Sequence, residues 1–402
     1  METGPSPRSV PFLFERIPLD SPASLGRESG PARKLTSALR AYAAIRQSAE
    51  RYGVRPTSLL NRFIRLYRRR FSPREIFFND LLNPRISDEA LERGACREEL
   101  IALDAKYALD SYLCLTADKA VFYSLCESAG IRVPKPLGIF DLPAGWTPDG
   151  RLLGSRAEWS AFARSLPTEF VVKPALGLLG KGVVAFRRDG DEFVDHLGRR
   201  YTADDLYESL CREKDQNLFS GGYSHHSLRL PAEGSHKAII QERLYAHPAI
   251  AELTGTVAIS TCRLITSSVD PSNTQIIASL FRVVTGNNIV DNFNKGQNGN
   301  LWCTLDTDSG QVVEACAPTR DRDRVEFVTR HPDTRREVVG FRIPEWEGVR
   351  ALCMQLAAVF RPQPVIHWDI GVTPEGPVVV EGNLCGDVLP GRMNRPIRSL
   401  LT

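Results

Sequence analysis

Two carboxylates and one amide late in the chain form the pattern with the clearest chemistry. Asp369 precedes the segment 373–377, and Glu381 and Asn383 follow it. The Pro-Glu-Gly centre of that segment is typical of a three-residue hairpin loop. Counting back from the loop places Asp369 opposite Glu381, with Asn383 on the same strand face as Glu381. Facing carboxylates repel each other, and a divalent cation held by oxygen ligands would remove the repulsion.

The same alternation predicts which side of this hairpin enters the core. Ile370, Val372, Val378 and Val380 fall between the polar positions and are expected to form the buried face. A hairpin whose polar side faces water would show the same residue types. The pattern by itself therefore leaves a metal site and a solvated strand face both open.

A lysine- and glycine-rich segment, 170–186, has the composition of a phosphate-binding hairpin. One strand ends in Lys173, a loop carries Gly180, Lys181 and Gly182, and a second strand follows. Glycines let backbone N–H groups approach phosphate oxygens, and lysines add positive charge. The spacing is not that of a Walker A loop, and no helix follows. Phosphate binding and an exposed glycine turn both fit this segment.

Three further segments carry polar groups: the end of one expected strand, the centre of another, and a loop. The strand 238–241 runs into Gln241, Glu242, Arg243 and Leu244, which suit either the edge of a heterocycle such as adenine or an ordinary strand end. Arg263 projects from the apolar strand 262–267 and needs an anion, either a ligand or a structural ion-pair partner. Lys295, in the polar loop 291–300, either reaches a reacting centre or remains in solvent.

Histidines and cysteines give little support for other chemistry. His225, His226 and His236 lack the spacing of a zinc site, and no nucleophile motif surrounds a cysteine. We therefore expect no zinc centre and no cysteine nucleophile.

The elements that must position these groups alternate along the chain from about residue 116 onward. Expected strands cover 137–140, 170–173, 183–187, 238–241, 262–267, 275–284, 365–372 and 378–381, and expected helices cover 155–166, 202–213 and 345–360. This alternation predicts an α+β or α/β enzyme body. Earlier segments, 35–70 and 87–130, are expected to be helical, with Ser87 as an N-cap. Residues 1–30 are rich in Pro, Ser and Gly, and we expect disorder there.

Composition is that of a soluble globular protein of more than one domain. The chain has 402 residues, 42% of them hydrophobic and 25% charged. A net charge of +3 gives no indication of a nucleic-acid partner. Nine scattered cysteines favour reduced thiols, and no apolar run approaches the ~18 residues of a membrane span. The first residues lack the layout of a signal peptide, so we predict a cytoplasmic protein.

An arginine-rich segment stands apart from this average. Eight arginines and no acid occur in residues 51–74, together with an apolar stripe from Leu59 to Tyr67. A helix docked on the rest of the protein is favoured. The alternative is a surface for an anionic membrane or an acidic partner.

Taken in order, these motifs resemble those of the ATP-grasp superfamily over about residues 116–392. The sequence is most similar to the sugar-transfer-associated ATP-grasp group. The motifs that carry the similarity are Phe170-Val-Val-Lys173-Pro, Gly180-Lys181-Gly182, Thr261-Cys-Arg263, Asp291-Asn292-Phe293, His331-Pro-Asp333-Thr334 and Glu381-Gly-Asn383.

The resemblance implies an α+β fold in which two subdomains grip ATP. We expect a helical N-terminal region at 31–115 and a pre-grasp region at 116–165. A subdomain with the glycine-rich loop would follow at 166–244, and one with the metal site at 245–402.

The resemblance also implies a role for each candidate residue. Lys173 and Lys181, with Gly180 and Gly182, would bind the α- and β-phosphates. Gln241, Glu242, Arg243 and Leu244 would line the adenine, and Glu252 would reach the ribose. Arg263 would stabilise the transferring phosphoryl group or the acyl phosphate, and Asp369, Glu381 and Asn383 would hold Mg²⁺. From its place in the polar loop, Lys295 is the second candidate catalytic residue. Two departures affect this assignment: Gln241 stands where many relatives have Glu, and Glu252 is not at the commonest spacing.

The sequence-based hypothesis is an ATP- and Mg²⁺-dependent ligase that joins a carboxylate to an amine through an acyl phosphate. Its substrates would be small molecules or peptides, and a glycan or natural-product pathway is the expected setting. The alternatives are a kinase on the same fold, and a nucleotide-binding scaffold protein.

Overall fold

The structure is a computed structural model that describes residues 31–107, 110–141, 144–176, 180, 182–211 and 237–384. Residues 1–30, Lys181, His225, His226 and His236 lie outside the described residues. The chain divides into two compact units. Unit 1 comprises Met1–Leu100, Pro318–Glu326 and Asp387–Ser399, and unit 2 comprises Ile101–Ala317, Phe327–Gly386 and Leu400–Thr402.

Unit 1 is mainly helical over residues 31–100. Its helices are α1 (Pro31–Tyr52), α2 (Pro56–Arg68), α3 (Pro73–Phe78) and α4 (Asp88–Arg93), and the chain enters unit 2 within α5 (Arg97–Tyr107). The helix expected at 35–70 is divided because Gly53 has a left-handed φ of 64° and Pro56 begins a new helix. Ser87 caps α4 by accepting the backbone N–H of Ala90, as predicted.

The arginine-rich helix α2 packs inside unit 1. Leu59 and Leu66 are buried, and the ring of Phe63 stacks on Phe77. Arg65 forms a two-pronged ion pair with Asp88 at 2.9 and 2.7 Å. These contacts agree with a docked helix, although Ile64 of the predicted stripe remains exposed.

Unit 2 begins with short helices and then builds an eight-stranded antiparallel sheet, the first sheet. The helices are α6 (Cys114–Ala117) and α7 (Lys119–Ser128), preceded by the 3-10 turn η2 (Asp110–Tyr112). The strand order is β3-β2-β1-β8-β4-β5-β6-β7. Its strands are β1 (Pro136–Asp141), β2 (Ala144–Trp146), β3 (Leu152–Leu153), β4 (Glu169–Pro174), β5 (Val184–Asp189), β6 (Glu192–Asp195), β7 (Arg200–Tyr201) and β8 (Ala238–Glu242).

Two helices supply the core of the first sheet. Trp159 and Phe162 of α8 (Arg156–Ser165) and Leu206 of α9 (Ala203–Cys211) share a buried cluster with Phe170 and Phe186 of the sheet. Burying such large side chains is the main stabilising contribution to this subdomain.

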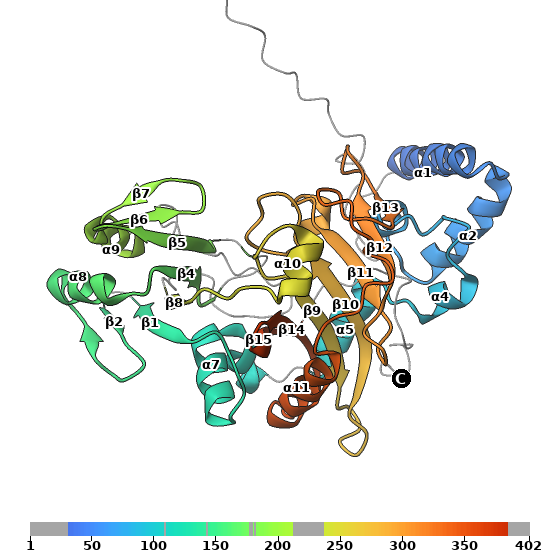
Figure 1. Cartoon of the computed structure of the whole chain (residues 1–402). Helices are drawn as coiled ribbons and strands as arrows, with labels where there is room; N and C mark the ends of the chain where they lie inside the picture. The colour runs from blue at the N-terminus through green and yellow to red at the C-terminus, as the bar shows by residue number, and fades with distance from the viewer. Residues whose placement is uncertain are drawn as a thin grey trace, which may run out of the picture. The chain divides into compact units, whose positions relative to one another are not determined.

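The second sheet has seven strands in the order β13-β12-β11-β10-β9-β14-β15. Its strands are β9 (Thr261–Ser267), β10 (Gln275–Val283), β11 (Leu301–Leu305), β12 (Val312–Pro318), β13 (Val325–Val328), β14 (Val365–Thr373) and β15 (Gly376–Asn383). The shorter elements α10 (Pro248–Thr254) and η3 (Asn294–Gly296) connect to it, and α11 (Trp346–Val359) packs against β9, β14 and β15 (Figure 1).

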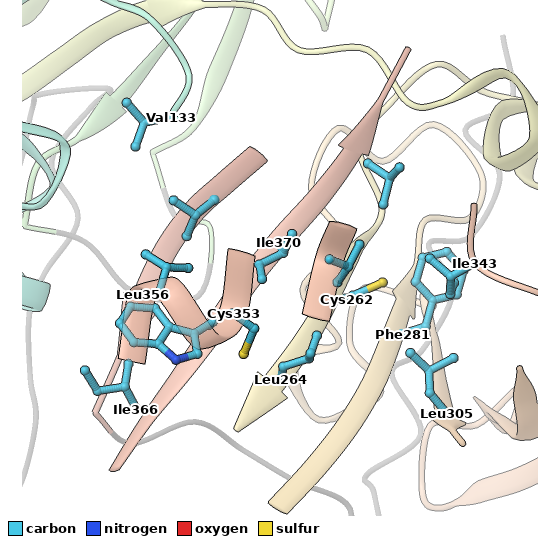
Figure 2. Packing of buried hydrophobic residues seen from close by; sticks show 14 of the residues in the cluster. Val133, Cys262, Leu264, Phe281, Leu305, Ile343, Cys353, Leu356, Ile366 and Ile370 are labelled. Carbon is cyan, nitrogen blue, oxygen red and sulfur yellow. The ribbon is translucent and has the colours of Figure 1, made fainter. Parts of the chain in front are cut away.

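The two faces of the second sheet differ in character. Figure 2 shows Cys353 and Leu356 of α11 among side chains of the face that carries Cys262, Leu264 and Ile370. Strand alternation sends Arg263 to the opposite face. The sheet therefore has an apolar face covered by a helix and a polar face that carries the candidate chemistry.

The expected body strands are all present, within one or two residues of their predicted ends. The strands β2, β3, β6, β7, β11, β12 and β13 were not predicted. Most of these are short, and too few residues alternate in them to give a clear period.

Two simpler expectations concern the cysteines and the membrane. Where cysteine side chains are described, at positions 96, 114, 126, 262, 303, 316 and 353, all carry free thiols. Within the described ranges, no helix combines the length and the hydropathy needed to cross a bilayer.

Candidate active site

The hairpin of β14 and β15 places Asp369 opposite Glu381, as predicted. The turn and the strand register that lead to this pairing differ from the prediction. Thr373 pairs with Gly376, so the turn has two central residues instead of the expected three. The hydroxyl of Thr373 tightens this turn by accepting the N–H of Glu375 and donating to the carbonyl of Gly376. A bulge between the pairings of Ile370 and Asp369 then restores the predicted carboxylate register.

Because of the bulge, the residues of β15 that enter the core differ from those predicted. Val379, not Val380, pairs with Ile370 and joins the core, whereas Val380 lines a cavity on the polar side. Val378 pairs with Gly371 and so lies on the face of Asp369. The predicted strand face is therefore wrong for Val378 and Val380, because one extra residue reverses the alternation, although Val378 is buried as predicted.

Buried arginines surround Asp369. Arg263 donates to both carboxylate oxygens of Asp369 at 2.8 Å. Arg282, from the neighbouring strand β10, contacts Asp369 at 3.0 Å and Asp291 at 3.1 Å. All four side chains are almost wholly buried, so each charge depends on its partners.

The ionisation of the two aspartates follows from this network. Burial would raise the pKa of Asp369, but Arg263 and Arg282 outweigh burial and lower its pKa to about 2. Burial raises the pKa of Asp291 above its ordinary value in spite of Arg282. Asp369 is thus held as a carboxylate. The repulsion from Glu381 that the sequence suggested is already offset by the arginines.

Glu381 has its own positive partner. Lys119, the first residue of α7, lies 3.4 Å from Glu381 Oε2. The amide of Asn383 donates to Glu381 Oε1 at 3.2 Å and to Asp369 Oδ2 at 3.3 Å. The three predicted metal-binding residues therefore lie together.

The donor set suits a hard cation. Two carboxylates are ligands that Mg²⁺ accepts, and Asn383, whose amide nitrogen faces both of them, would add its oxygen after a half-turn of the amide. Asp369 Oδ1 receives only the Nε–H of Arg263, whereas Oδ2 already receives three donors, so Oδ1 has the free lone pair. Among the described residues, no three His, Cys, Asp or Glu side chains form a metal-binding group, so Asn383 is needed to complete the set.

Lys173 ends β4 in a different electrostatic setting. Its Nζ donates to the hydroxyl of Tyr123 at 2.6 Å, and no acid of the described residues lies within salt-bridge distance. Burial, assisted by the nearby charge of Lys119, lowers the pKa of Lys173 to about 7, and Glu381 opposes the shift. A phosphate arriving at Lys173 would meet a cation that has no counter-charge.

A cavity of about 170 Å³ connects these groups. Strands of both sheets and the loop before η3 line it. Its polar lining is Lys119, Lys173, Gln241, Arg243, Thr261, Arg282, Asp291, Asn292, Asp369 and Glu381, and Gly180, Leu244, Ile259, Val290 and Val380 are among the remaining lining residues. Lys173 and the carboxylates of Asp369 and Glu381, predicted from separate segments, thus line the same cavity.

The loop between β4 and β5 needs glycine where it is described. Gly180 and Gly182 have φ values of 67° and 73°, in the left-handed region. A Cβ on Gly180 would lie 3.2 Å from the side chain of Val290, so this position also lacks space. Lys181, predicted to bind phosphate, lies outside the described residues.

Other predicted residues lie away from the cavity lining. Glu242 accepts the backbone N–H of Lys135, and Glu252 pairs with Arg336 on the surface. Lys295 is exposed, with a left-handed φ of 51°. The roles expected for Glu242, Glu252 and Lys295 stay predictions.

Four residues of the site were not predicted for it: Lys119, Tyr123, Arg282 and Asp291. Arg282 carried the same signal as Arg263, a cation within an apolar strand. Lys119 begins a helix, where the macrodipole disfavours a cation unless an anion is near. Tyr123 gave no signal, because its partners are at least 50 residues away in sequence.

Comparison with known proteins gives one family and several solved structures. The family described as sugar-transfer associated ATP-grasp matches residues 101–394. No curated protein matches the sequence.

The solved structures are distant. The VanG D-Ala:D-Ser ligase from Enterococcus faecalis is 12% identical, with 73% of this chain and 63% of that chain covered and a TM-score of 0.38. The L-amino acid ligase from Bacillus licheniformis is 11% identical, with coverages of 67% and 40% and a TM-score of 0.32. The D-cycloserine synthetase DcsG is 17% identical, with coverages of 69% and 65% and a TM-score of 0.32. The chain thus spans less than two thirds of the length of each of these structures.

Proposed function

The chain belongs to the sugar-transfer-associated ATP-grasp family, and from this premise we propose that it is an ATP-dependent ligase that joins a carboxylate to an amine. One observation carries the proposal. Lys173 on the first sheet and the Asp369–Glu381 hairpin on the second sheet line the same cavity. A nucleotide in that cavity would have its phosphates between a lysine without a counter-charge and a set of oxygen ligands.

The nucleotide would use residues of both sheets. Lys173 and Lys181, with the backbone of Gly180 and Gly182, would bind the phosphates. Gln241 near the end of β8, and Arg243 and Leu244 just after it, would line the adenine. Glu242 would contribute backbone groups only, since its side chain accepts from Lys135. Glu252 would have to leave Arg336 to reach a ribose.

Asp369, Glu381 and Asn383 would hold Mg²⁺. When bound, the cation would supply positive charge to the phosphate oxygens. The protein's own contribution at this point is orientation, because Arg263 and Lys119 fix the two carboxylates before any ligand arrives.

The proposed reaction has two steps. A carboxylate oxygen of the substrate attacks the γ-phosphorus of ATP, the bond to the β–γ bridging oxygen breaks, and ADP leaves. The amine then attacks the acyl carbon, loses a proton and displaces inorganic phosphate, leaving an amide. In the first step, Lys173 and Arg282, both in the cavity lining, would stabilise the charge on the transferring phosphoryl group.

Arg263 would act differently from the role implied by resemblance. Both of its donor groups toward the site are engaged by Asp369, and it is absent from the cavity lining. Arg263 would orient Asp369, and Arg282 would be the arginine that meets the substrate. The family description leaves the acid and the amine open, and association with sugar transfer supports a glycan pathway.

Product analysis tests the proposal. The protein is incubated with Mg²⁺-ATP and a panel of carboxylic acids and amines, and inorganic phosphate and product mass are measured. We expect phosphate release and an amide only when both partners are present. Phosphate retained on one substrate would identify a kinase. Nucleotide binding without turnover across the panel would support a scaffold.

A further inference from the structure

We infer that Tyr123 is a positioning residue of the proposed nucleotide site, whose hydroxyl fixes the Lys173 ammonium between the two sheets. The inference rests on the proposed function, because Lys173 matters only if a phosphate binds there. Nothing in the sequence assigns a role to Tyr123. Its ring is buried, 1% exposed, in the middle of α7.

The hydroxyl of Tyr123 lies among three partners from three different strands. Lys173 Nζ on β4 is 2.6 Å away, Gln241 Oε1 on β8 is 3.1 Å away, and the carbonyl oxygen of Val380 on β15 is 3.0 Å away. A phenol has a single proton, which goes to Gln241 or to Val380. Its oxygen is then left to accept from Lys173. The direction of the hydrogen bond between Lys173 and Tyr123 is thereby fixed.

This arrangement connects the phosphate lysine with the metal hairpin. Val380 is the bulge residue that immediately precedes Glu381. Four residues before Tyr123, Lys119 on the same helix face contacts Glu381 itself. Helix α7 thus holds Lys173 and Glu381 in fixed relation to each other through two adjacent side chains.

Holding Lys173 matters because its side chain is long and flexible. A lysine with four rotatable bonds loses conformational freedom when it binds a ligand, and a side chain already held in place loses less. Tyr123 has no negative charge, so it orients the ammonium without neutralising it.

A double-mutant cycle separates positioning from packing. Mg²⁺-ADP binding is measured by calorimetry for wild type, Tyr123→Phe, Lys173→Ala and the double variant. Tyr123→Phe keeps the ring and removes the hydroxyl. We expect it to weaken binding about tenfold, the loss typical of one hydrogen bond to a charged group. In the Lys173→Ala background, the same change should have no further effect.

A matched control is Tyr201→Phe, which removes the hydroxyl that contacts Asp195 in the first sheet, outside the cavity lining. It should bind Mg²⁺-ADP like wild type. Equal losses from Tyr123→Phe with and without Lys173 would overturn the inference, as would wild-type binding by Tyr123→Phe.

A second readout covers the case of poor folding. In wild-type protein, the ¹⁵N-labelled ammonium of Lys173 should show hindered exchange with solvent, assigned by its absence in Lys173→Ala. Rapid exchange would contradict a fixed ammonium. Failure of wild type to bind Mg²⁺-ADP at all would instead remove the proposed function, so the two failures are distinguishable.

Discussion

The two sheets of unit 2 bring positive charge to the cavity in opposite ways. The second sheet contributes Arg282, supported by Arg263, and both already pair with aspartates. The first sheet contributes Lys173, whose only hydrogen-bond partner among described residues is a neutral phenol. The comparison indicates a division of labour. We therefore expect the arginine network to fix geometry and to stabilise the fold, and the lysine to supply the charge that the proposed nucleotide would neutralise.

Removing Asp369 is the strongest way to break this comparison. Asp369→Asn leaves Arg263 and Arg282 buried with one carboxylate fewer between them, and losing one partner of a buried pair costs about 3–5 kcal/mol. We expect the free energy of unfolding, measured by urea denaturation, to fall by roughly that amount. An unchanged free energy would mean that the network does not stabilise the fold.

Glu381→Gln is the matched control on the opposite strand. The Glu381 side chain is 27% exposed and pairs with Lys119 at 3.4 Å, so its loss should change stability by less than about 1 kcal/mol. Phosphate release should nevertheless be abolished if Glu381 binds the metal. Wild-type turnover in this variant would make these residues the polar face of a structural hairpin.

Lys173→Ala tests the other half of the comparison. It should weaken ATP binding at least tenfold, about 1.4 kcal/mol, because it removes a cavity-lining cation that has no counter-ion among the described residues. Stability should not fall, since burying the ammonium is unfavourable. Calorimetry should show unchanged affinity for Lys135→Ala, an exposed lysine outside the cavity lining.

The pH dependence of stability and of nucleotide affinity also tests the role of Lys173. The pKa of Lys173 is about 7 in the folded protein and 10.5 ordinarily, so the unfolded chain binds more protons between those values. Stability without ligand should therefore rise with pH through that window. Affinity for Mg²⁺-ADP should fall above pH 7, approaching about tenfold per unit, because phosphate needs the ammonium. Calorimetry from pH 6 to 9 should show this trend, and Lys173→Ala should lack it.

The smallest effect is expected in unit 1. Arg65 and Asp88 form an exposed pair, so Arg65→Ala should change the free energy of unfolding by less than about 1 kcal/mol. Wild-type protein should also fail to float with acidic liposomes at physiological salt, because the α2 stripe is partly buried within unit 1. Strong flotation would favour the membrane-surface alternative.

Local patterns in the sequence predicted the elements well. Alternation located β4, β8, β9, β10, β14 and β15, and Ser87 marked the start of α4. The failures came where one residue changes the outcome. Gly53 divided a predicted helix, and the bulge at Val380 exchanged core and cavity positions.

The site was predictable only in part, for a physical reason. Arg263 and Asp369 each carried a local signal, a charge within an apolar strand. Their mutual pairing did not, because 106 residues separate them and only the strand order brings β9 beside β14. Tyr123 is the extreme case. An aromatic residue on an amphipathic helix is expected to be a core residue, and only its distant partners reveal a role in the site.

The β14–β15 hairpin also has consequences for its tolerance of change. A two-residue turn with a bulge and a three-residue turn without one use the same number of residues and give Asp369 the same partner. With the bulge, Pro377 and Val379 lie on the core face, whereas the other arrangement would place Val378 and Val380 there. The pairing of Asp369 with Glu381 is therefore the same for either type of turn. A library of variants at residues 374–380 should therefore change the cavity lining at Val380 and keep Asp369 paired with Glu381.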